Sequence, residues 1–265
     1  LEFRRVLFRS ADGNTYHQTI HRIEYDHIPR IVYGSSVKLN AVKITVRMAA
    51  KKIGYIKGAG DEVPEVMRQM GYTVEELTES DMTLSRLQSF DAIVTGIRAY
   101  NIHSWLTDAH SVFESYVKQG GVVLLQYNTA SAIGPLKNKQ WPFSFTITRQ
   151  RVCDEKAPVT FLQPSHPLLC FPNQITQQDF EGWVQERSIY EAQPKGEDFI
   201  PLLAMNDSGE APQQGSLLVK DFDKGRYIYT GLTFFRQLAA GVPGACRLWA
   251  NLVANPGFST LPLHP

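Results

Sequence analysis

The sequence has little cysteine, and its three cysteines lie far apart. Cys153, Cys170 and Cys246 form no Cys-x-x-Cys pair, so the 265 residues indicate neither a disulfide framework nor a thiolate zinc site. Long apolar runs are also missing. The longest, residues 122–125 and 228–235, have the length of a strand, well short of the roughly 18 residues that span a bilayer. We therefore expect no membrane span.

Neither sign of charge dominates the chain. It has 27 Lys and Arg against 26 Asp and Glu, a net charge of +1, and an ordinary globular composition with 43% hydrophobic residues. So small a net charge gives no broad cationic field, which argues against nucleic acid as a partner. Leaving out residues 1–10 removes three Arg and one Glu, and the net charge then becomes −1.

The first ten residues do not resemble part of a domain. They mix charged and apolar side chains, and they lack the apolar core and the small-residue cleavage site of a signal peptide. They resemble the translated reading frame of a sequencing-library adapter. We therefore treat residues 1–10 as an artefact, and expect the chain to be a metagenomic fragment whose natural sequence continues upstream of Ala11.

Alternating strands come first along the rest of the chain. Residues 19–25 and 42–48 alternate apolar and polar side chains, and Pro29 and Gly34 interrupt the pattern between them. Two or three such strands cannot bury a face by themselves. Residues 11–50 are therefore predicted to be the end of a truncated β-sandwich.

From residue 51 to residue 254 strands alternate with helices. The pattern predicts apolar strands at residues 53–56, 72–74, 91–96 and 122–125, separated by helices at residues 63–70, 81–89 and 105–119. Asp61 is the expected N-cap of the first helix, and Gly71 its end. This order predicts an α/β domain with a parallel sheet and right-handed crossovers. A β-rich second half includes a strand at residues 183–190, a helix at 243–254 closes the domain, and residues 255–265 are a loose tail.

Ligands of open α/β sheets bind at the carboxyl ends of the strands. Gly58, Gly60 and Asp61 follow the first strand and have the small residues of a phosphate loop. The third glycine of a dinucleotide fingerprint and the Gly-Lys-Ser/Thr of a P-loop are missing, and Asp61 would repel phosphate. The residues therefore favour a plain turn with a helix cap over a nucleotide site.

Polar side chains also follow the next two strands. Arg98, Tyr100 and Asn101 suit a carboxylate or sugar hydroxyls, and Gln126 and Asn128 could bind the same ligand. The alternative interpretation, with equal weight, is that these side chains satisfy the backbone of their loops.

An acidic and aromatic cluster lies further along the chain. Asp179, Glu181 and Trp183 are of the kind that binds sugars, and the two carboxylates could act as an acid and base pair. The interpretation favoured by the residues is a capped turn before a strand that buries Trp183.

No metal or nucleophile motif stands out. His17 and His21 would share one face of a strand, but neither their spacing nor that of the other histidines is a known ligand signature. The positions of a nucleophile elbow hold Ile97-Arg98 or Tyr127-Asn128 in place of Ser or Cys.

Four stretches resemble the C-terminal region of large bacterial PIG-L (LmbE-like) deacetylases. They are residues 52–64, 91–101, 179–187 and 229–238, and the last of them adds Arg236 to the candidate ligand contacts. The resemblance covers residues 16 to 254. It implies that residues 51–254 form a flavodoxin-like domain of the class I glutamine amidotransferase type.

In that family an N-terminal domain binds a catalytic zinc through His-Pro-Asp-Asp and His-x-x-His motifs, and hydrolyses N-acetyl groups of amino sugars. Neither motif occurs here. The resemblance therefore implies no catalytic residue, metal or cofactor in this chain, and zinc only in a missing catalytic domain. Because secretion signals are common in the family, it also implies a periplasmic or extracellular location.

The expected function is that of a non-catalytic accessory domain of a zinc-dependent N-acetyl-sugar deacetylase in carbohydrate metabolism. Such a domain would bind an amino sugar or glycan, pack against the missing deacetylase domain, or form a homo-oligomer. The alternative is a degenerate amidotransferase-like hydrolase that acts on a sugar derivative. Its residues would be Arg98, Tyr100, Asn101, Gln126, Asn128 and Glu181.

Overall fold

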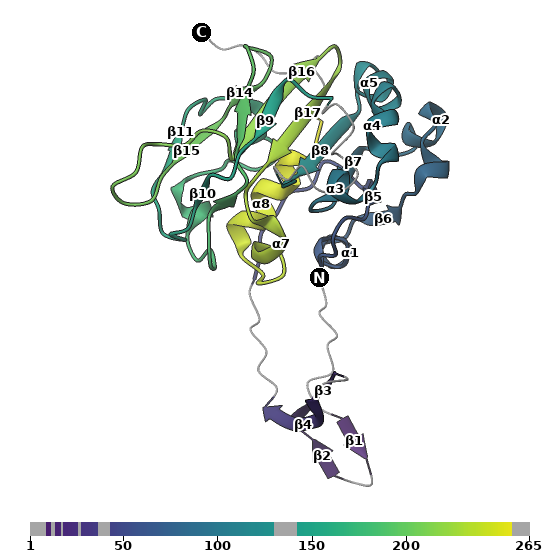
Figure 1. Cartoon of the computed structure of the whole chain (residues 1–265), viewed down its shortest axis with the longest axis vertical. Helices are drawn as coiled ribbons and strands as arrows, with labels where there is room; N and C mark the ends of the chain where they lie inside the picture. The colour runs from purple at the N-terminus through teal and green to yellow at the C-terminus, as the bar shows by residue number, and fades with distance from the viewer. Residues whose placement is uncertain are drawn as a thin grey trace. The chain divides into compact units, whose positions relative to one another are not determined.

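The computed structural model in Figure 1 describes residues 9–11, 14–16, 18–25, 28–36, 43–129 and 142–255. The chain divides into two units, Leu1–Lys43 and Ile44–Pro265. Among the described residues, no helix has both the length and the apolar character that crossing a bilayer requires.

The first unit contains two antiparallel hairpins. One pairs β1 (Arg9–Ala11) with β2 (Asn14–Tyr16), and the other pairs β3 (Gln18–Tyr25) with β4 (Ile28–Ser36). These strands lie in the region where the sequence predicts the end of a β-sandwich.

The prediction of a strand at residues 42–48 is wrong for residues 43–48, which are the ones that the structure describes. Residues 43–48 are irregular, because the backbone of Arg47 pairs with a side chain. The Arg47 amide donates to Asn173 Oδ1 over 2.9 Å, and Asn173 Nδ2 donates to the Arg47 carbonyl over 2.9 Å. An asparagine thus takes the two backbone groups that a neighbouring strand would use.

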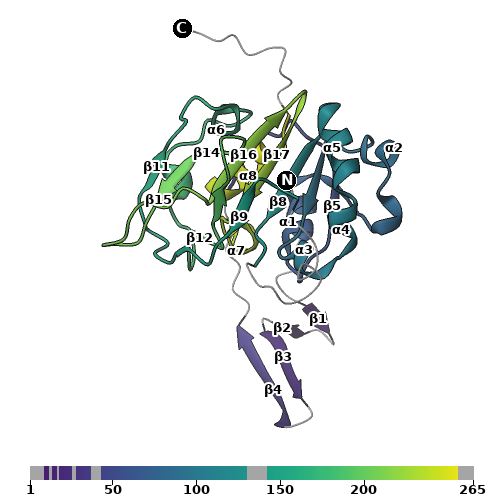
Figure 2. The same ribbon diagram turned by 45° about the horizontal axis from the view of Figure 1, so that its top comes forward.

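A seven-stranded sheet organises the second unit, in the order β14-β16-β17-β8-β7-β5-β6 (Figures 1 and 2). The five parallel strands are β5 (Lys52–Ile56), β6 (Thr73–Glu76), β7 (Ala92–Thr95), β8 (Val122–Gln126) and β17 (Gly225–Thr230). The strands β16 (Leu217–Phe222) and β14 (Ile200–Pro201) extend it antiparallel. The predicted α/β parallel sheet is confirmed. Strand order reverses between β5 and β7.

Helices cover both faces of this sheet. The helices α1 (Val63–Met70) and α8 (Pro243–Leu252) pack on one face, and α2 (Leu84–Leu87), α3 (Ala99–Ile102), α4 (Trp105–Asp108) and α5 (His110–Lys118) on the other. Side chains alternate between the two cores, as in any strand. In β8, Val122 and Leu124 enter the first core, while Val123 and Leu125 enter the second.

The helices differ from the prediction mainly at their starts. The N-cap position of α1 is Glu62, one residue later than predicted, but Asp61 Oδ1 accepts from the Val63 amide over 3.0 Å and so caps the first turn as expected. The predicted end at Gly71, in the left-handed region with φ 108°, is confirmed. Residues 81–89 hold only the 3₁₀ turn η1 (Glu79–Asp81) and α2, because Thr78 and Asp81 form a capping box that closes the first turn early. The predicted helix at 105–119 is divided into α4 and α5.

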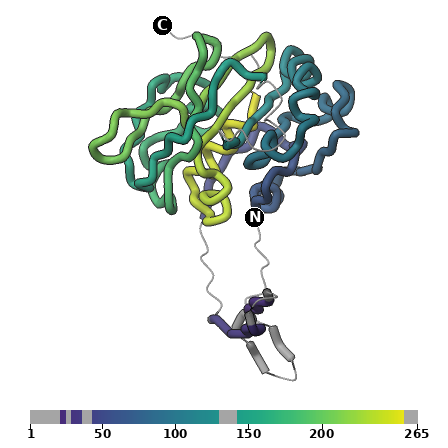
Figure 3. The backbone as a smooth tube through the Cα atoms, in the orientation of Figure 1, coloured from purple at the N-terminus to yellow at the C-terminus, as the bar shows by residue number. Residues whose placement is uncertain are grey.

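The β-rich second half forms three two-stranded antiparallel sheets, traced in green in Figure 3 on the side of the main sheet away from α2. They pair β9 (Phe145–Ile147) with β13 (Ala192–Pro194), β10 (Arg151–Val152) with β12 (Ser188–Ile189), and β11 (Val159–Phe161) with β15 (Leu203–Met205). The helices α6 (Pro167–Cys170) and α7 (Phe234–Gln237) and the 3₁₀ turn η3 (Gln177–Phe180) lie in the same half. Of the strand predicted at residues 183–190, only β12 is present.

Candidate functional site

The turn from β7 into α3 has the form of a nucleophile elbow with an arginine at its apex. Arg98 occupies the left-handed region with φ 59° and ψ 22°, which is uncommon for a residue other than glycine. Its amide donates to the Tyr127 carbonyl over 2.8 Å, and its carbonyl accepts from the Asn101 amide over 2.9 Å. Strained residues of this kind concentrate at functional sites. Arg98 is exposed, so the turn presents a guanidinium where hydrolases present a nucleophile.

Three aromatic rings lie together at the end of β8. Tyr127 stacks on Tyr190 with ring centroids 5.6 Å apart and planes 10° apart, and its centroid is 5.6 Å from that of Phe235. Tyr190 is also in the left-handed region, with φ 52°. Tyr190 and Phe235 are half-buried. Together they form a partly exposed aromatic platform.

A second arginine lies beside this platform. Arg236 of α7 pairs with the buried Glu186 carboxylate, and its guanidinium carbon is 4.9 Å from the Phe235 centroid. Burial raises the pKa of the Tyr127 hydroxyl, while the guanidinium groups of Arg98 and Arg236 both act to lower it. Two cations from separate elements therefore act on one hydroxyl. We call Arg98, Tyr127, Tyr190, Phe235 and Arg236 the crest site.

The loop after β5 is packed against the elbow loop. A Cβ atom at Gly58 would lie 2.0 Å from the Ile97 carbonyl oxygen, and the Ala59 amide donates to that oxygen over 2.8 Å. Asp61 accepts from the Tyr55 hydroxyl over 2.7 and 2.9 Å and from the Ile97 amide over 3.3 Å. Burial raises the pKa of Asp61. Gly58 and Asp61 thus hold the elbow in place, whereas Gly60, with φ 98°, forms an open turn.

Four more predicted residues connect the loops beneath the crest. The Gln126 amide donates to the Tyr55 hydroxyl over 3.0 Å, and Asn128 Oδ1 accepts from the Tyr100 amide over 3.0 Å. Asn101 Oδ1 accepts from the Thr129 amide over 2.8 Å. The side chains of all four are buried, and the Tyr100 ring packs in the core. The structure therefore brings these residues together around the strand ends, with hydrogen bonds directed to the protein itself.

Glu181 lies in a different place, after the turn η3. Its side chain is exposed, whereas its neighbour Asp179 is buried and accepts from the Thr176 amide over 2.8 Å. Asp179 also pairs with Arg247 over 2.7 Å, and its carbonyl accepts from the Trp183 indole over 2.9 Å. The capped turn favoured by the sequence is present. The two carboxylates are not arranged as a pair facing one ligand.

The histidines contact protein groups. His21 Nε2 lies 2.7 Å from Ser35 Oγ, and its ring stacks on Tyr33; His17 lies outside the described side chains. His166 Nδ1 accepts from the Leu168 amide, and burial lowers the pKa of His166 to about 4. Within the described part of the chain, no group of three or more His, Cys, Asp or Glu residues is placed to hold a metal ion.

Sequence reasoning missed the three rings of the crest site. Tyrosine and phenylalanine are common in protein cores, so the residue types of Tyr127, Tyr190 and Phe235 did not point to a site. Nothing in the sequence indicates that Tyr190 has a positive φ. One signal was available for Tyr127, because it directly follows an apolar strand and so stands where ligand contacts are expected.

Glu191, the residue after Tyr190, is a buried acid. It is 1% exposed, and its carboxylate accepts from the Ser188 hydroxyl over 2.6 Å and from the Gly215 amide over 2.9 Å. Burial raises the pKa of Glu191, and these two hydrogen bonds offset that rise only in part. Its burial therefore disfavours the negatively charged form of Glu191.

We expect Glu191→Gln to raise the free energy of unfolding at pH 7 by on the order of 1 kcal/mol. Glutamine can accept from Gly215 and donate to Ser188 without a buried charge. Because the folded pKa of Glu191 is raised, the contribution of this side chain to stability is fully present below the unfolded pKa and is lost as pH rises through the folded pKa. The gain should therefore vanish near pH 4 in urea denaturation, at about the pKa of an unperturbed Glu. An equal gain at both pH values would contradict this account.

Comparisons with known proteins bear on the fold. No protein-family model matches the chain, and no curated protein matches it. A cytoplasmic protein from Salmonella typhimurium LT2 is similar in structure, with a TM-score of 0.50 and 14% identity over 76% of this chain and 98% of that chain. The shared fold is a mixed α/β one, and in this chain it is built on a mostly parallel sheet of seven strands. At this identity the similarity concerns the fold alone.

Other solved structures match more loosely. A protein from Bacteroides uniformis described as ThuA-like has a TM-score of 0.48 and 15% identity, over 84% of this chain and 98% of that one. A GMP synthase component from Thermoplasma acidophilum has a TM-score of 0.40 and 14% identity, over 77% and 97%.

The expected membership of the PIG-L deacetylases is wrong. No family model matches the chain, that of the PIG-L deacetylases included, and no curated protein matches it. The stretches that carried the resemblance are pieces of this fold. Residues 52–64 contain β5 and the start of α1, and residues 91–101 contain β7 and the elbow. Strand, turn and helix units of this kind favour similar residues in many proteins with a parallel α/β sheet.

Proposed function

We propose that the α/β unit is a non-catalytic binding domain that holds a sugar acid at the crest site. The observation that carries this proposal is the elbow arginine. Arg98 stands at the apex of a strained turn in a fold whose enzymes need a nucleophile there. A guanidinium stays protonated and has no lone pair to attack a carbonyl group, so covalent catalysis from the apex does not operate.

The chemistry of the crest site supports an anionic, ring-bearing ligand. Guanidinium groups bind carboxylates through two parallel hydrogen bonds, and the exposed Arg98 offers such a group. Arg236, which is paired with Glu186, lies over the Phe235 ring of the same site. Tyr190 and Phe235 offer partly exposed ring faces, on which the apolar face of a sugar can pack. A ligand with one carboxylate on a sugar ring uses both features.

A degenerate hydrolase is the second candidate, and the acids near the crest argue against it. General acid or base catalysis needs a carboxylate within hydrogen-bond reach of the substrate. Asp61 is bonded to Tyr55 and to the elbow backbone, and Glu186 is paired with Arg236. Both acids thus have structural partners, which favours binding without turnover.

Titration calorimetry with glucuronate and glucose tests the proposal. We expect saturable binding of glucuronate, weaker by about tenfold or more in Arg98→Asn, because the loss of a charged hydrogen bond has about that effect. Asparagine tolerates the left-handed conformation, so the variant keeps the turn. Arg68→Ala, at an exposed arginine in the last turn of α1, is the matched control and should bind normally. Equal binding of glucose and glucuronate, or full binding by Arg98→Asn, would refute the proposal.

A further inference from the structure

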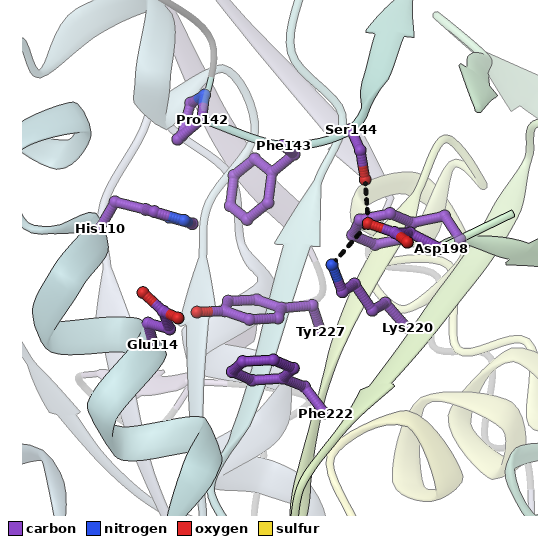
Figure 4. Close-up of a pocket in the computed structure, with 10 residues that line it drawn as sticks. His110, Glu114, Pro142, Phe143, Ser144, Asp198, Lys220, Phe222 and Tyr227 are labelled. Atoms are coloured by element: carbon purple, nitrogen blue, oxygen red, sulfur yellow. Dashed lines mark hydrogen bonds and ion pairs between the residues drawn. The ribbon is translucent and has the colours of Figure 1, made fainter. Parts of the chain in front are cut away.

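A separate pocket of about 260 Å³ lies on the face of the sheet that α5 covers. Its walls come from α5, from the residues before β9 and β14, and from β16 and β17 (Figure 4). It is not part of the crest site, because Tyr227 of β17 pairs with Val123 near the start of β8, whereas Tyr127 follows the end of that strand.

Aromatic rings belong to half of the ten residues that line the pocket. His110, Phe143 and Tyr227 point toward one another in Figure 4, with centroid distances of 5.1 Å for His110 and Phe143 and 5.6 Å for Phe143 and Tyr227. Phe199 and Phe222 also line the pocket, and Phe222 lies beside Tyr227 in Figure 4. Walls of ring faces and edges favour a planar ring that stacks between them.

Each charged group of the pocket has an ion-pair partner, which for Glu114 lies outside the pocket. Lys220 Nζ donates to Asp198 Oδ2 over 2.8 Å, and the Ser144 hydroxyl reaches the same oxygen over 3.2 Å. Glu114 pairs with Lys118 over 3.1 Å. Because these pairs leave little net charge in the pocket, a neutral ligand fits it better than an ion.

The groups that still have hydrogen-bonding capacity are mostly acceptors. Within the described residues, the Tyr227 hydroxyl and His110 Nδ1 are buried and have no hydrogen-bond partner, and Tyr227 is only 4% exposed. Each of the carboxylates of Glu114 and Asp198 has a second oxygen that can accept. A ligand that donates hydrogen bonds would satisfy this set, since an unpaired buried polar group is costly.

We propose that this pocket binds a neutral, planar heteroaromatic ring that carries an amino group, of the aminopurine type. The rings of the wall stack on the heterocycle, and the amino group donates to Glu114 or to the Tyr227 hydroxyl. The volume agrees, because a cavity of ~150 Å³ holds one benzene ring and this pocket is larger. The inference is independent of the crest site.

The test compares adenine with purine, which lacks only the amino group, by NMR titration of the whole ¹⁵N-labelled chain. We expect adenine to shift the signals of residues 110, 114 and 227 and to bind about tenfold more tightly than purine. Tyr227→Phe and Glu114→Gln should each lower the affinity for adenine by a factor of about three to ten. Glu79→Gln, at an exposed acid of η1, is the control and should bind as the wild-type chain does.

Three outcomes would overturn the proposal: no saturable shift with adenine, equal affinity for adenine and purine, or unchanged affinity in both pocket variants. The spectrum of each variant without ligand shows whether it is folded, so a loss of binding by misfolding is recognised. Glucuronate should not compete with adenine. A failure of the crest site and a failure of this pocket are therefore distinguishable.

Discussion

Asp179→Ala is expected to lower the free energy of unfolding by about 2–4 kcal/mol. The carboxylate is buried, closes the capping box of η3 through the Thr176 amide, and pairs with Arg247 over 2.7 Å. Its removal leaves the first amide of the turn without an acceptor and the Arg247 guanidinium without its anion. Chemical denaturation at pH 7 measures the loss.

The control is Glu181→Ala, two residues further along the chain. Glu181 is exposed, and replacing an exposed acid usually changes stability by less than about 0.5 kcal/mol. If both variants lost the same stability, the structural role given to Asp179 would be wrong. If both kept their stability and lost sugar binding, the pair of acids would be a ligand site after all.

Gly58→Ala is expected to cost about 3 kcal/mol and to weaken ligand binding at the crest. The new methyl group would lie 2.0 Å from the Ile97 carbonyl oxygen and 2.8 Å from the carbonyl carbon, which are both backbone atoms. Neither can move without shifting the residue next to Arg98. Thermal denaturation gives the stability, and calorimetry with glucuronate gives the effect on the elbow.

A comparison of Gly60→Ala with Gly58→Ala separates the effect of steric crowding from the effect of backbone conformation. A Cβ atom there meets nothing within 4 Å, but φ is 98°, so the variant should cost only about 1–2 kcal/mol of conformational strain. Binding should be almost unchanged, because Gly60 does not contact the elbow loop. A larger loss in Gly60→Ala than in Gly58→Ala would mean that the contact with Ile97 is not what requires glycine.

The parallel sheet could be predicted because its signals are local. All four side chains of residues 122–125 are apolar, which is typical of a strand with a helix layer on both faces. In the structure all four are fully buried. Gly71 likewise ends α1 in the conformation that glycine favours. Such features depend on a few neighbouring residues, so one sequence is enough to find them.

The crest site could not be predicted in the same way, because distant segments assemble it. Two hydrogen bonds hold Tyr190 in its place beside Tyr127. The amide of its neighbour Ile189 donates to the Gly231 carbonyl over 2.8 Å, and the Tyr229 hydroxyl donates to the Tyr190 carbonyl over 2.5 Å. These contacts are tertiary. The sequence placed Arg98 at a strand end and Arg236 among the candidates, but nothing in it showed that the two act on one tyrosine.

The sheet order also affects how the chain can fold. The strands β5, β6, β7 and β8 follow one another and can pair as they are made, but the other edge of β8 is completed only by β17. Until Gly225–Thr230 has been synthesised, the apolar strand Val122–Gln126 has an unpaired edge in the middle of the future sheet. Such edges pair readily with other chains. The long β-rich insertion therefore delays the step that protects the nascent protein from association.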